Sequence, residues 1–313
     1  MALSGSSTDF ISKPATPSNV MTFGAVGNGV TDDSNILGNI VAPQKKSEWK
    51  SSNVDTWIAF ERINGLIVNG HGKIDGRGQA WWTEGNLNTS FESKGTIVGS
   101  PRPTALHFFQ CNNLQVDGLN HINSQRNHIS ITNCNGATIS NLHISAPETS
   151  PNTDGIDISG STNIQILHCN IGTGDDCIAI IGGSSFINIS NIACGPGHGI
   201  SIGSLGENGK SDQVEEVHVK DSSFTATKNG VRIKTWQSSA VKISDVSYTR
   251  VQGTSINAAA ITLNCSHTVP CTNIILDHVN ITSTDPKQPT HADCINAHGS
   301  SIATFPPVGC LLK

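Results

Sequence analysis

The sequence predicts an all-β solenoid of the parallel β-helix type, and three observations carry that prediction. A short motif recurs at nearly regular intervals, the residues around it are β-branched and alternate between apolar and polar, and helical periodicity is nearly absent. Charged residues make up only 14% of the chain and aromatic residues 5%. A helical bundle or coiled coil needs roughly twice as much charge. We therefore expect one domain over residues 1–313, with residues 1–20 poorly ordered.

The repeat consists of an apolar residue, a spacer, a small or polar residue and usually another apolar residue. Its units start at Val68, Val116, Ile139, Ile166, Ile189, Val219, Ile243 and Leu276. From Val116 onward the units are 23 to 33 residues apart, which matches one turn of a β-helix. A propeller blade would need about 40–50 residues. Inward-facing Ile and Val should therefore stack from turn to turn, about 4.8 Å apart.

The charge balance limits the partners of the chain. Lys and Arg number 19 against 24 Asp and Glu, a net charge of −5, so nucleic acid is not expected as the main partner. No run of about 18 apolar residues occurs, so no membrane span is expected. The first residues lack the basic and apolar segments of a signal peptide. Nine cysteines still indicate a secretory background, and so do four Asn-x-Ser/Thr sites at Asn88, Asn188, Asn264 and Asn280.

Four short motifs with chemically useful side chains occur in register with the repeat. They are Asn152-Thr153-Asp154, Gly174-Asp175-Asp176, Gly197-His198-Gly199 and Arg232-Ile233-Lys234. Asp154 and Asp176 are 22 residues apart, and so are Asp176 and His198, so one turn of the coil separates each pair. Arg232 follows after 34 residues, and we interpret residues 205–216 as an insertion. The spacing therefore predicts that the four motifs stack on one side of the coil.

This constellation suits cleavage of a glycosidic bond in an anionic substrate. Asp154, Asp175 and Asp176 would lie too close together to ionise freely, so at least one pKa should be raised. A protonated carboxyl can then serve the leaving oxygen, while an ionised one activates water or the anomeric carbon. Arg232 and Lys234 point to the same side of a strand and would pair with a negative group of the substrate.

Other interpretations stay open on the residues alone. Asp154, Asp175, Asp176 and His198 could form a metal site, since paired aspartates often bind Ca²⁺ or close a turn. His198 could tune or relay the proton of a catalytic carboxyl, or it could be an ordinary loop residue between two glycines. The segment 232–234 could be a solvated strand face.

The four motifs in this order resemble the signature of polygalacturonases, a family of pectin-cleaving glycoside hydrolases. Further segments are similar to plant members, among them FGAVGNGVTDDS, GKIDGRGQAWW, RPTALHF, GDDCIAI, CGPGHGISIGSLG and NGVRIKTWQ. The resemblance covers most of residues 20–310. It implies a right-handed parallel β-helix that hydrolyses α-1,4 bonds of galacturonan with inversion, without a metal or cofactor. It also implies a secreted cell-wall enzyme, and we expect a monomer acting on polygalacturonate.

The resemblance assigns roles to the catalytic candidates. Asp175 corresponds to the general acid, Asp154 and Asp176 to the residues that activate water, and His198 to a support of the acid. One tension accompanies this assignment. Inverting enzymes commonly separate their carboxyls by ~6.5–9.5 Å, whereas adjacent turns of the coil are only ~4.8 Å apart.

The resemblance also names the residues that bind substrate. Arg232 and Lys234 would hold the galacturonate carboxylate. Asn152 and Gly199 fall within matched motifs and are expected at the substrate as well.

Two stretches typical of the family are missing from this chain. After Asn35 the alanine-rich capping helix and a first coil are absent, so we expect an incomplete N-terminal cap. After Gln237 roughly two turns with a substrate-shaping tyrosine are absent, and Tyr248, the only tyrosine of the chain, belongs to another repeat. An inactive or pectin-binding truncated homologue is therefore an alternative, and hydrolysis of a substituted galacturonan is another.

The cysteines add a modest set of expectations that follow family usage. Cys177 with Cys194 would link the turns beside the acid and His198 motifs, and Cys265–Cys271 and Cys294–Cys310 would be local pairs. Cys111, Cys134 and Cys169 recur at similar repeat positions, so we expect them to stack as reduced residues inside the coil.

Overall fold

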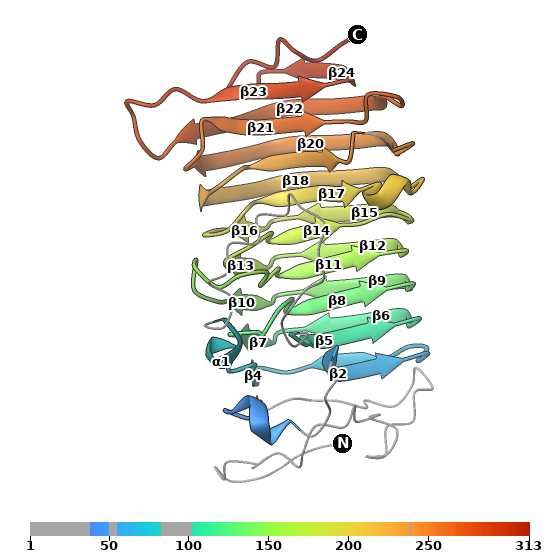
Figure 1. The fold of residues 1–313 in the computed structure, drawn as a ribbon, viewed down its shortest axis with the longest axis vertical. Helices are drawn as coiled ribbons and strands as arrows, with labels where there is room; N and C mark the ends of the chain where they lie inside the picture. Colours follow the sequence, from blue (N-terminus) through green and yellow to red (C-terminus); the bar gives the residue numbers. More distant parts are fainter. Residues whose placement is uncertain (1–37, 50–54, 83–101, 238) are drawn as a thin grey trace.

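The computed structural model describes residues 38–49, 55–82, 102–237 and 239–313, which form one column of stacked β-strands (Figure 1). Helical structure in these ranges is limited to α1 (Gln79–Trp82) and the 3₁₀ segments Lys46–Glu48 and Glu207–Gly209. The predicted all-β, right-handed parallel β-helix is confirmed. The predictions about residues 1–20 and the N-terminal cap fall outside the described residues. No helix in the described part is long and apolar enough to cross a lipid bilayer.

One face of the coil, here called face one, is a sheet of nine parallel strands. In stacking order they are β2 (Thr56–Glu61), β5 (Thr104–Phe109), β8 (Ile129–Thr132), β11 (Ile156–Ser159), β14 (Ile178–Ile180), β17 (Ile200–Leu205), β19 (Val231–Thr235), β21 (Ala259–Asn264) and β23 (His291–Ile295). Each strand pairs in parallel with the strand of the next turn, so side chains at equivalent positions form ladders along the coil.

The other two faces belong to a sheet of fifteen strands. Face two contains β3 (Ile67–Asn69), β6 (Asn112–Asp117), β9 (Asn135–Ser140), β12 (Thr162–Leu167) and β15 (Ser184–Ser190). Face three contains β1 (Asn39–Val41), β4 (Lys73–Asp75), β7 (Asn120–Ile122), β10 (His143–Ser145), β13 (Asn170–Gly172) and β16 (Ala193–Cys194). The two faces merge at β18 (Gln213–Thr227), a long strand that pairs with both β15 and β16. The turns above it continue as β20 (Lys242–Ser255), β22 (Cys271–Ser283) and β24 (Ala297–Ile302).

Inward-facing aliphatic side chains fill the coil because the side chains of a strand alternate between its two faces. On face one, Ile158, Ile180, Ile202 and Ile233 pair from strand to strand and are fully buried. Burial of each such side chain stabilises the fold by about 2–3 kcal/mol. A shift of one residue would expose the whole ladder, so the ladder fixes which side chains of each strand point outward.

The structure confirms most of the predicted repeat and corrects one unit. Val116, Ile139, Ile166, Ile189 and Val219 stack in register as predicted. The next unit was expected at Ile243, and this is wrong, because Val219 pairs with Tyr248 while Ile243 pairs with Val214. The sequence of β20 alternates over fourteen residues without a turn, so it offers the apolar motif at several positions.

The coil closes in register around the point where family residues are missing. Beyond Gln237, strand β20 pairs with β18 through Gln213 and Lys242, and β21 pairs with β19 through Val231 and Ile261. The missing segment is therefore compatible with loss of whole turns rather than a fraction of one.

The three expected disulfides and the reduced state of the other three cysteines are confirmed. Disulfides join Cys177 to Cys194, Cys265 to Cys271 and Cys294 to Cys310. The remaining cysteines of the chain, Cys111, Cys134 and Cys169, are free and buried. Cys111 and Cys134 stack directly before β6 and β9. The expectation that Cys169 stacks with them is wrong, because Cys169 stands before β13, where the register places it between Leu142 and Ile192. Tyr248 is fully buried inside the coil, so it does not reach the surface where the motif residues lie.

Candidate active site

The motif residues lie in the turns that join face three to face one, which we call the site corner. Asp154, Asp176 and His198 each stand two residues before a face-one strand, and Ile156, Ile178 and Ile200 pair in register behind them. Backbone hydrogen bonds hold these turns on one another: Gly155 N donates to Asp176 O over 2.9 Å, and Cys177 N donates to Gly199 O over 2.8 Å. The predicted spacing of one turn is therefore found in the structure.

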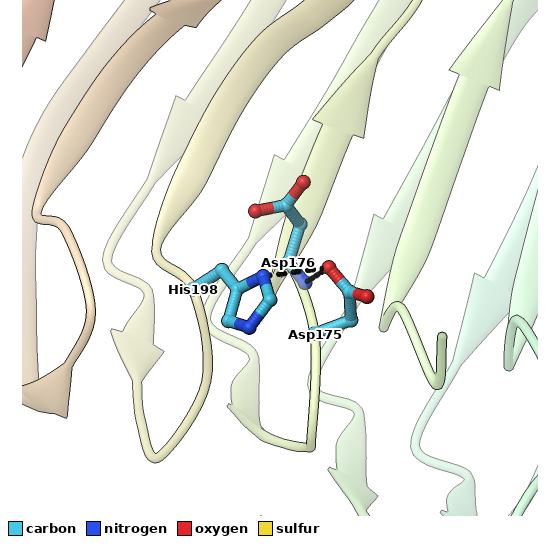
Figure 2. A group of neighbouring side chains, drawn as sticks. All are labelled: Asp175, Asp176 and His198. Carbon is cyan, nitrogen blue, oxygen red and sulfur yellow. Dashed lines mark hydrogen bonds and ion pairs between the residues drawn. The ribbon is translucent and has the colours of Figure 1, made fainter. Parts of the chain in front are cut away.

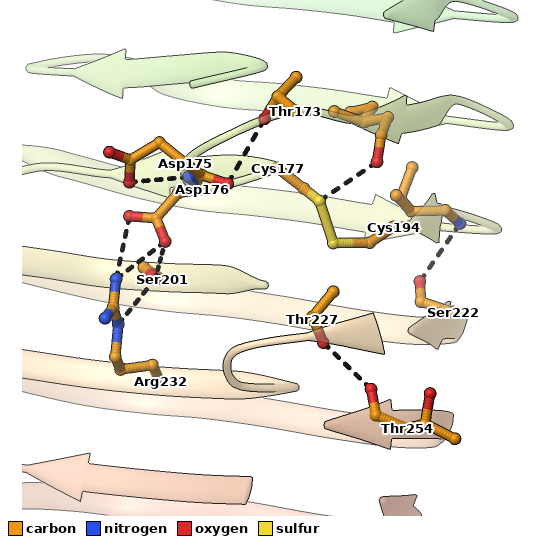
Figure 3. The surroundings of a disulfide bond; sticks show 12 residues. Thr173, Asp175, Asp176, Cys177, Cys194, Ser201, Ser222, Thr227, Arg232 and Thr254 are labelled. Atoms are coloured by element: carbon orange, nitrogen blue, oxygen red, sulfur yellow. Dashed lines mark hydrogen bonds and ion pairs between the residues drawn. A yellow bond between two sulfur atoms is a disulfide. The ribbon is translucent and has the colours of Figure 1, made fainter. Parts of the chain in front are cut away.

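Arg232 follows one turn further along, as predicted from the insertion. It pairs with Ser201 across β17 and β19, and its outward position alternates with the buried Val231 and Ile233. Arg232 Nη2 lies 2.8 and 3.2 Å from the two carboxylate oxygens of Asp176, and Arg232 Nε donates to Ser201 Oγ over 3.1 Å (Figure 3). Ser201 Oγ donates to Asp176 Oδ1 over 2.7 Å, so Arg232 and Ser201 together fix the position of the Asp176 carboxylate.

The Asp176–Arg232 pair is largely shielded from solvent, with side-chain exposures of 8% and 16%. Burial raises the pKa of Asp176, Arg232 opposes this, and Asp175 raises the pKa further, so the net direction is upward. Lys234 lies two residues beyond Arg232 on the same side of β19 and is half-buried. Burial and the neighbouring Arg232 lower the pKa of Lys234, while Asp176, Asp175 and Asp154 counteract them.

Asp175 accepts hydrogen bonds from three different elements of the site. His198 Nδ1 lies 2.8 Å from Asp175 Oδ1, and Asp176 N donates to the same oxygen over 2.9 Å (Figure 2). Asn152 Nδ2 donates to Asp175 Oδ2 over 3.3 Å. Burial alone would raise the pKa of Asp175. The hydrogen bond from His198, the Asp176 N–H and the charge of Arg232 outweigh it and lower that pKa below its ordinary value.

Lys228 determines which nitrogen of His198 carries the proton. Lys228 Nζ lies 2.6 Å from His198 Nε2, and an ammonium can only donate, so Nε2 acts as the acceptor. The imidazole proton is then on Nδ1, where it faces Asp175 Oδ1. The motif analysis missed Lys228. Extending the register by one more turn would have found it, because Lys228 stands three residues before β19, as Asp175 stands three residues before β14.

A fourth carboxyl, Asp157, belongs to the cluster and was also missed. It lies on the outward side of β11, and its Oδ2 accepts a hydrogen bond from Asn127 Nδ2, while its buried Oδ1 has no hydrogen-bond partner. Burial raises the pKa of Asp157 to about 8, and Asp176 adds to the increase while Arg126 opposes it. The alternation of β11 could have revealed it, since Asp157 is the outward residue between two buried isoleucines.

The carboxylates differ in the direction of their pKa shifts. Burial, followed by repulsion from Asp157, Asp175 and Asp176, raises the pKa of Asp154 well above its ordinary value. The expectation of a raised pKa is therefore met at Asp154 and Asp176. In contrast, Asp175, which the resemblance implies as the proton donor, is the member whose pKa is lowered in the unliganded protein.

Arg102 approaches the carboxylate cluster from the N-terminal turns of the coil. It belongs to the RPTALHF segment, and the sequence analysis predicted no role for it. Its Nη1 donates to Pro151 O over 2.6 Å, and its Nη2 donates to Asn152 Oδ1 over 2.5 Å. Burial and the neighbouring Arg126 lower the pKa of Arg102, while Asp175 and Asp154 counteract them. Asn152 is thus held between Arg102 and Asp175, which places this predicted residue at the centre of the site.

Gly199 has a structural reason to be glycine. Its φ is +96°, and a Cβ atom there would lie 2.1 Å from Asn229 O and 2.6 Å from Gly230 O. Any side chain would therefore separate two turns of the coil beside His198.

Among the described residues, Asp175, Asp176 and His198 could together hold a metal ion, since their ligand atoms lie within 4.8 Å of one another. Asp175 is bonded to His198, and Asp176 is bonded to Arg232. A cation at this place would be repelled by the guanidinium of Arg232, which already balances the charge of Asp176. The geometry therefore fits a polar hydrogen-bonded site better than a metal centre.

Residues 17–249 and 237–304 match the family described as glycosyl hydrolases family 28, and the chain belongs to this family. The two matched segments overlap at residues 237–249, beside the point where family residues were expected to be missing.

Named relatives agree with the family assignment, and a solved structure shares the fold. A probable polygalacturonase of Arabidopsis thaliana is 38% identical, and the alignment covers 93% of this chain and 80% of the relative. Polygalacturonase-2 of Solanum lycopersicum is 37% identical over 87% of this chain and 66% of its own length. The polygalacturonase of Erwinia carotovora ssp. carotovora is 22% identical and has a TM-score of 0.66, with 93% of this chain and 100% of that one covered, which shows a shared fold.

Proposed function

We propose that this chain hydrolyses α-1,4-galacturonosyl bonds of homogalacturonan with inversion, by acid and base catalysis at its carboxylate cluster. The observation that carries the proposal is the stacking of Asp154, Asp175 and Asp176 on two adjacent turns, with Arg232 and Lys234 beside them. The polygalacturonase names of the relatives support the same substrate.

In this proposal Asp175 is the proton donor, although the pKa of Asp175 is lowered without substrate. Binding of a galacturonate unit brings a negative charge and excludes water from the turns around Asp175. Both effects disfavour the ionised carboxylate and raise its pKa towards the value that a general acid needs. His198, fixed by Lys228, supplies the hydrogen bond that keeps Asp175 pointed at the leaving oxygen.

Asp154 and Asp176 are the residues that activate water. Oxygen atoms of Asp175 and Asp176 lie within 4.8 Å of each other, which is less than the ~6.5–9.5 Å usual for a water placed between two carboxyls. The attacking water therefore belongs on the side of Asp154, one turn away from Asp175. A bound substrate carboxylate draws on Lys234 and Arg232, which are the cations of that part of the site.

The proposal also covers the substrate, the cofactors, the oligomeric state and the location of the enzyme. Polygalacturonate is the partner, no metal or other cofactor takes part, and the protein acts as a secreted monomer in the cell wall. The three disulfides are in keeping with an oxidising compartment.

The test is release of reducing ends from polygalacturonic acid, with sizing of the products. Wild-type protein should release oligogalacturonides, and Asp175→Asn should abolish release while the circular dichroism stays unchanged. Asp285→Asn, an exposed residue of the loop before β23, is the matched control and should keep full activity. Near-normal turnover by Asp175→Asn would remove Asp175 as the acid. A folded wild-type protein that releases nothing would favour the inactive, pectin-binding alternative.

A further inference from the structure

Two arginines lie on the side of the carboxylates that is opposite Arg232 and Lys234 along the coil. Arg126 is in the site-corner turn before β8, which is the neighbour of the turn that holds Asp154, since His128 N donates to Asp154 O over 2.7 Å. Arg102 is one turn further, before β5. The carboxylates are thus flanked by cations at both ends of the site.

Arg102 and Arg126 place positive charge against the motif residues themselves. Arg102 reaches over the turn of Arg126 to donate to Pro151 O and Asn152 Oδ1, and Asn152 in turn contacts Asp175. Arg126 is exposed, and its charge acts on both Arg102 and Asp157. The two guanidinium groups are therefore neighbours at the edge of the site, and one of them faces solvent.

Neither arginine forms an ion pair with an acidic side chain in the described part of the chain. Asp157, the acidic residue next to Arg126, is bonded instead to the amide of Asn127. Two like charges held together without a bonded carboxylate leave a place where an added anion is favourable.

From this arrangement we propose that Arg126 and Arg102 form a second carboxylate-binding subsite. It takes a galacturonate unit on the side of the cleaved bond that faces the N-terminal turns of the coil. The proposal rests on the proposed function and adds a specificity determinant to it. Arg126 is the adaptable contact because it is exposed. Arg102 also shapes the turn at Asn152, so its guanidinium is fixed in place before substrate arrives.

The chemistry of the substrate explains why a second subsite is useful. Every unit of homogalacturonan carries a carboxylate, so the units on both sides of the cleaved bond bring a negative charge to the protein. Lys234 and Arg232 serve one side, and Arg126 with Arg102 serve the other. An enzyme with cations at both ends selects a run of charged units, and methyl esters at either end should weaken binding.

The test compares Arg126→Gln with wild-type protein on polygalacturonate and on the same polymer after full methyl-esterification. We expect KM for polygalacturonate to rise roughly fivefold, which corresponds to the loss of one exposed ion pair, with kcat nearly unchanged. The difference should shrink as salt is added, because salt screens exposed charges. On the esterified polymer the two proteins should not differ. Arg62→Gln, an exposed arginine at the corner between face one and face two, should behave as wild type.

A binding measurement separates failure of this subsite from failure of the proposed function. Hexagalacturonate is titrated calorimetrically into Asp175→Asn and into Asp175→Asn combined with Arg126→Gln, so that no turnover is needed. Weaker binding by the double variant supports the subsite even if the wild type releases no reducing ends. Equal binding by both variants, or a KM that rises equally on esterified and charged polymer, overturns the proposal.

Discussion

Replacement of Asp157 by Asn tests the electrostatics of the carboxylate cluster without touching the proposed proton donor. Asp157 accepts a hydrogen bond from Asn127 at Oδ2, and its Oδ1 is buried without a partner. An asparagine has the same shape as the protonated acid. Its carbonyl can accept from Asn127, and its NH₂ group can occupy the position of Oδ1. Asp157→Asn therefore imitates the neutral state of the side chain at every pH.

The magnitude follows from the pKa of Asp157, which burial raises from its ordinary 3.8 to about 8. Between these pH values the Asp157 carboxyl of the folded protein holds a proton that the unfolded chain releases. The contribution of Asp157 to the free energy of unfolding is therefore greatest below pH 4 and falls as pH rises towards 8. Each pH unit corresponds to ~1.4 kcal/mol, which gives an upper limit of about 6 kcal/mol for the window. Water at the edge of the cleft reduces this, and we expect Asp157→Asn to be more stable by about 2–3 kcal/mol at pH 8.

The assay is guanidinium unfolding followed by circular dichroism at several pH values between 4 and 8. The pKa values of Asp154 and Asp176 are raised as well, so wild type and variant should both lose stability as pH rises, and the variant should lose less. Asp285→Asn, which is exposed, is the control for loss of a carboxyl as such. An unchanged pH dependence in Asp157→Asn, or lower stability than wild type at pH 8, would refute the reasoning.

Three further predictions follow from the same structure. Lys228→Met removes the donor to His198 Nε2 and should lower kcat on polygalacturonate several-fold, while Lys228→Arg should restore most of it; equal rates for all three proteins would contradict the positioning role of Lys228. Loss of the Cys177–Cys194 disulfide by a double serine substitution opens a loop of 17 residues and should lower the free energy of unfolding by about 3 kcal/mol, measured by guanidinium titration; no change would show that the link adds nothing to stability. Polygalacturonate hydrolysis should survive EDTA, and a loss of rate that Ca²⁺ restores would assign Asp175, Asp176 and His198 to a cation.

The coil and the stacking of the motifs could be predicted from the sequence because both depend on periodicity. Inward Ile and Val repeat once per turn, and the 22-residue spacing of Asp154, Asp176 and His198 places them in adjacent turns. The same regularity caused the error at Ile243. A long strand such as β20 alternates throughout, so the position of one stacked residue is not marked by a turn.

The contacts that tune the site could not be predicted in the same way. Lys228 and Arg102 act through long side chains that cross from one turn to another, and the turns of the site corner differ in length. Periodicity gives the place of a Cα atom, but it does not tell where a flexible cation ends. The sequence also does not predict the directions of the pKa shifts, because they depend on burial and on partners such as Ser201, which lies outside the four motifs.

The most direct test of the central claim is proton NMR of polygalacturonate during digestion by the wild-type protein. If the carboxylate cluster of Asp154, Asp175 and Asp176 cleaves α-1,4 bonds with inversion, the new reducing ends must appear first as the β-anomer and only later mutarotate. First appearance of the α-anomer would contradict the assigned roles of the carboxylates, and the absence of any new reducing ends from a folded protein would contradict the catalytic function itself.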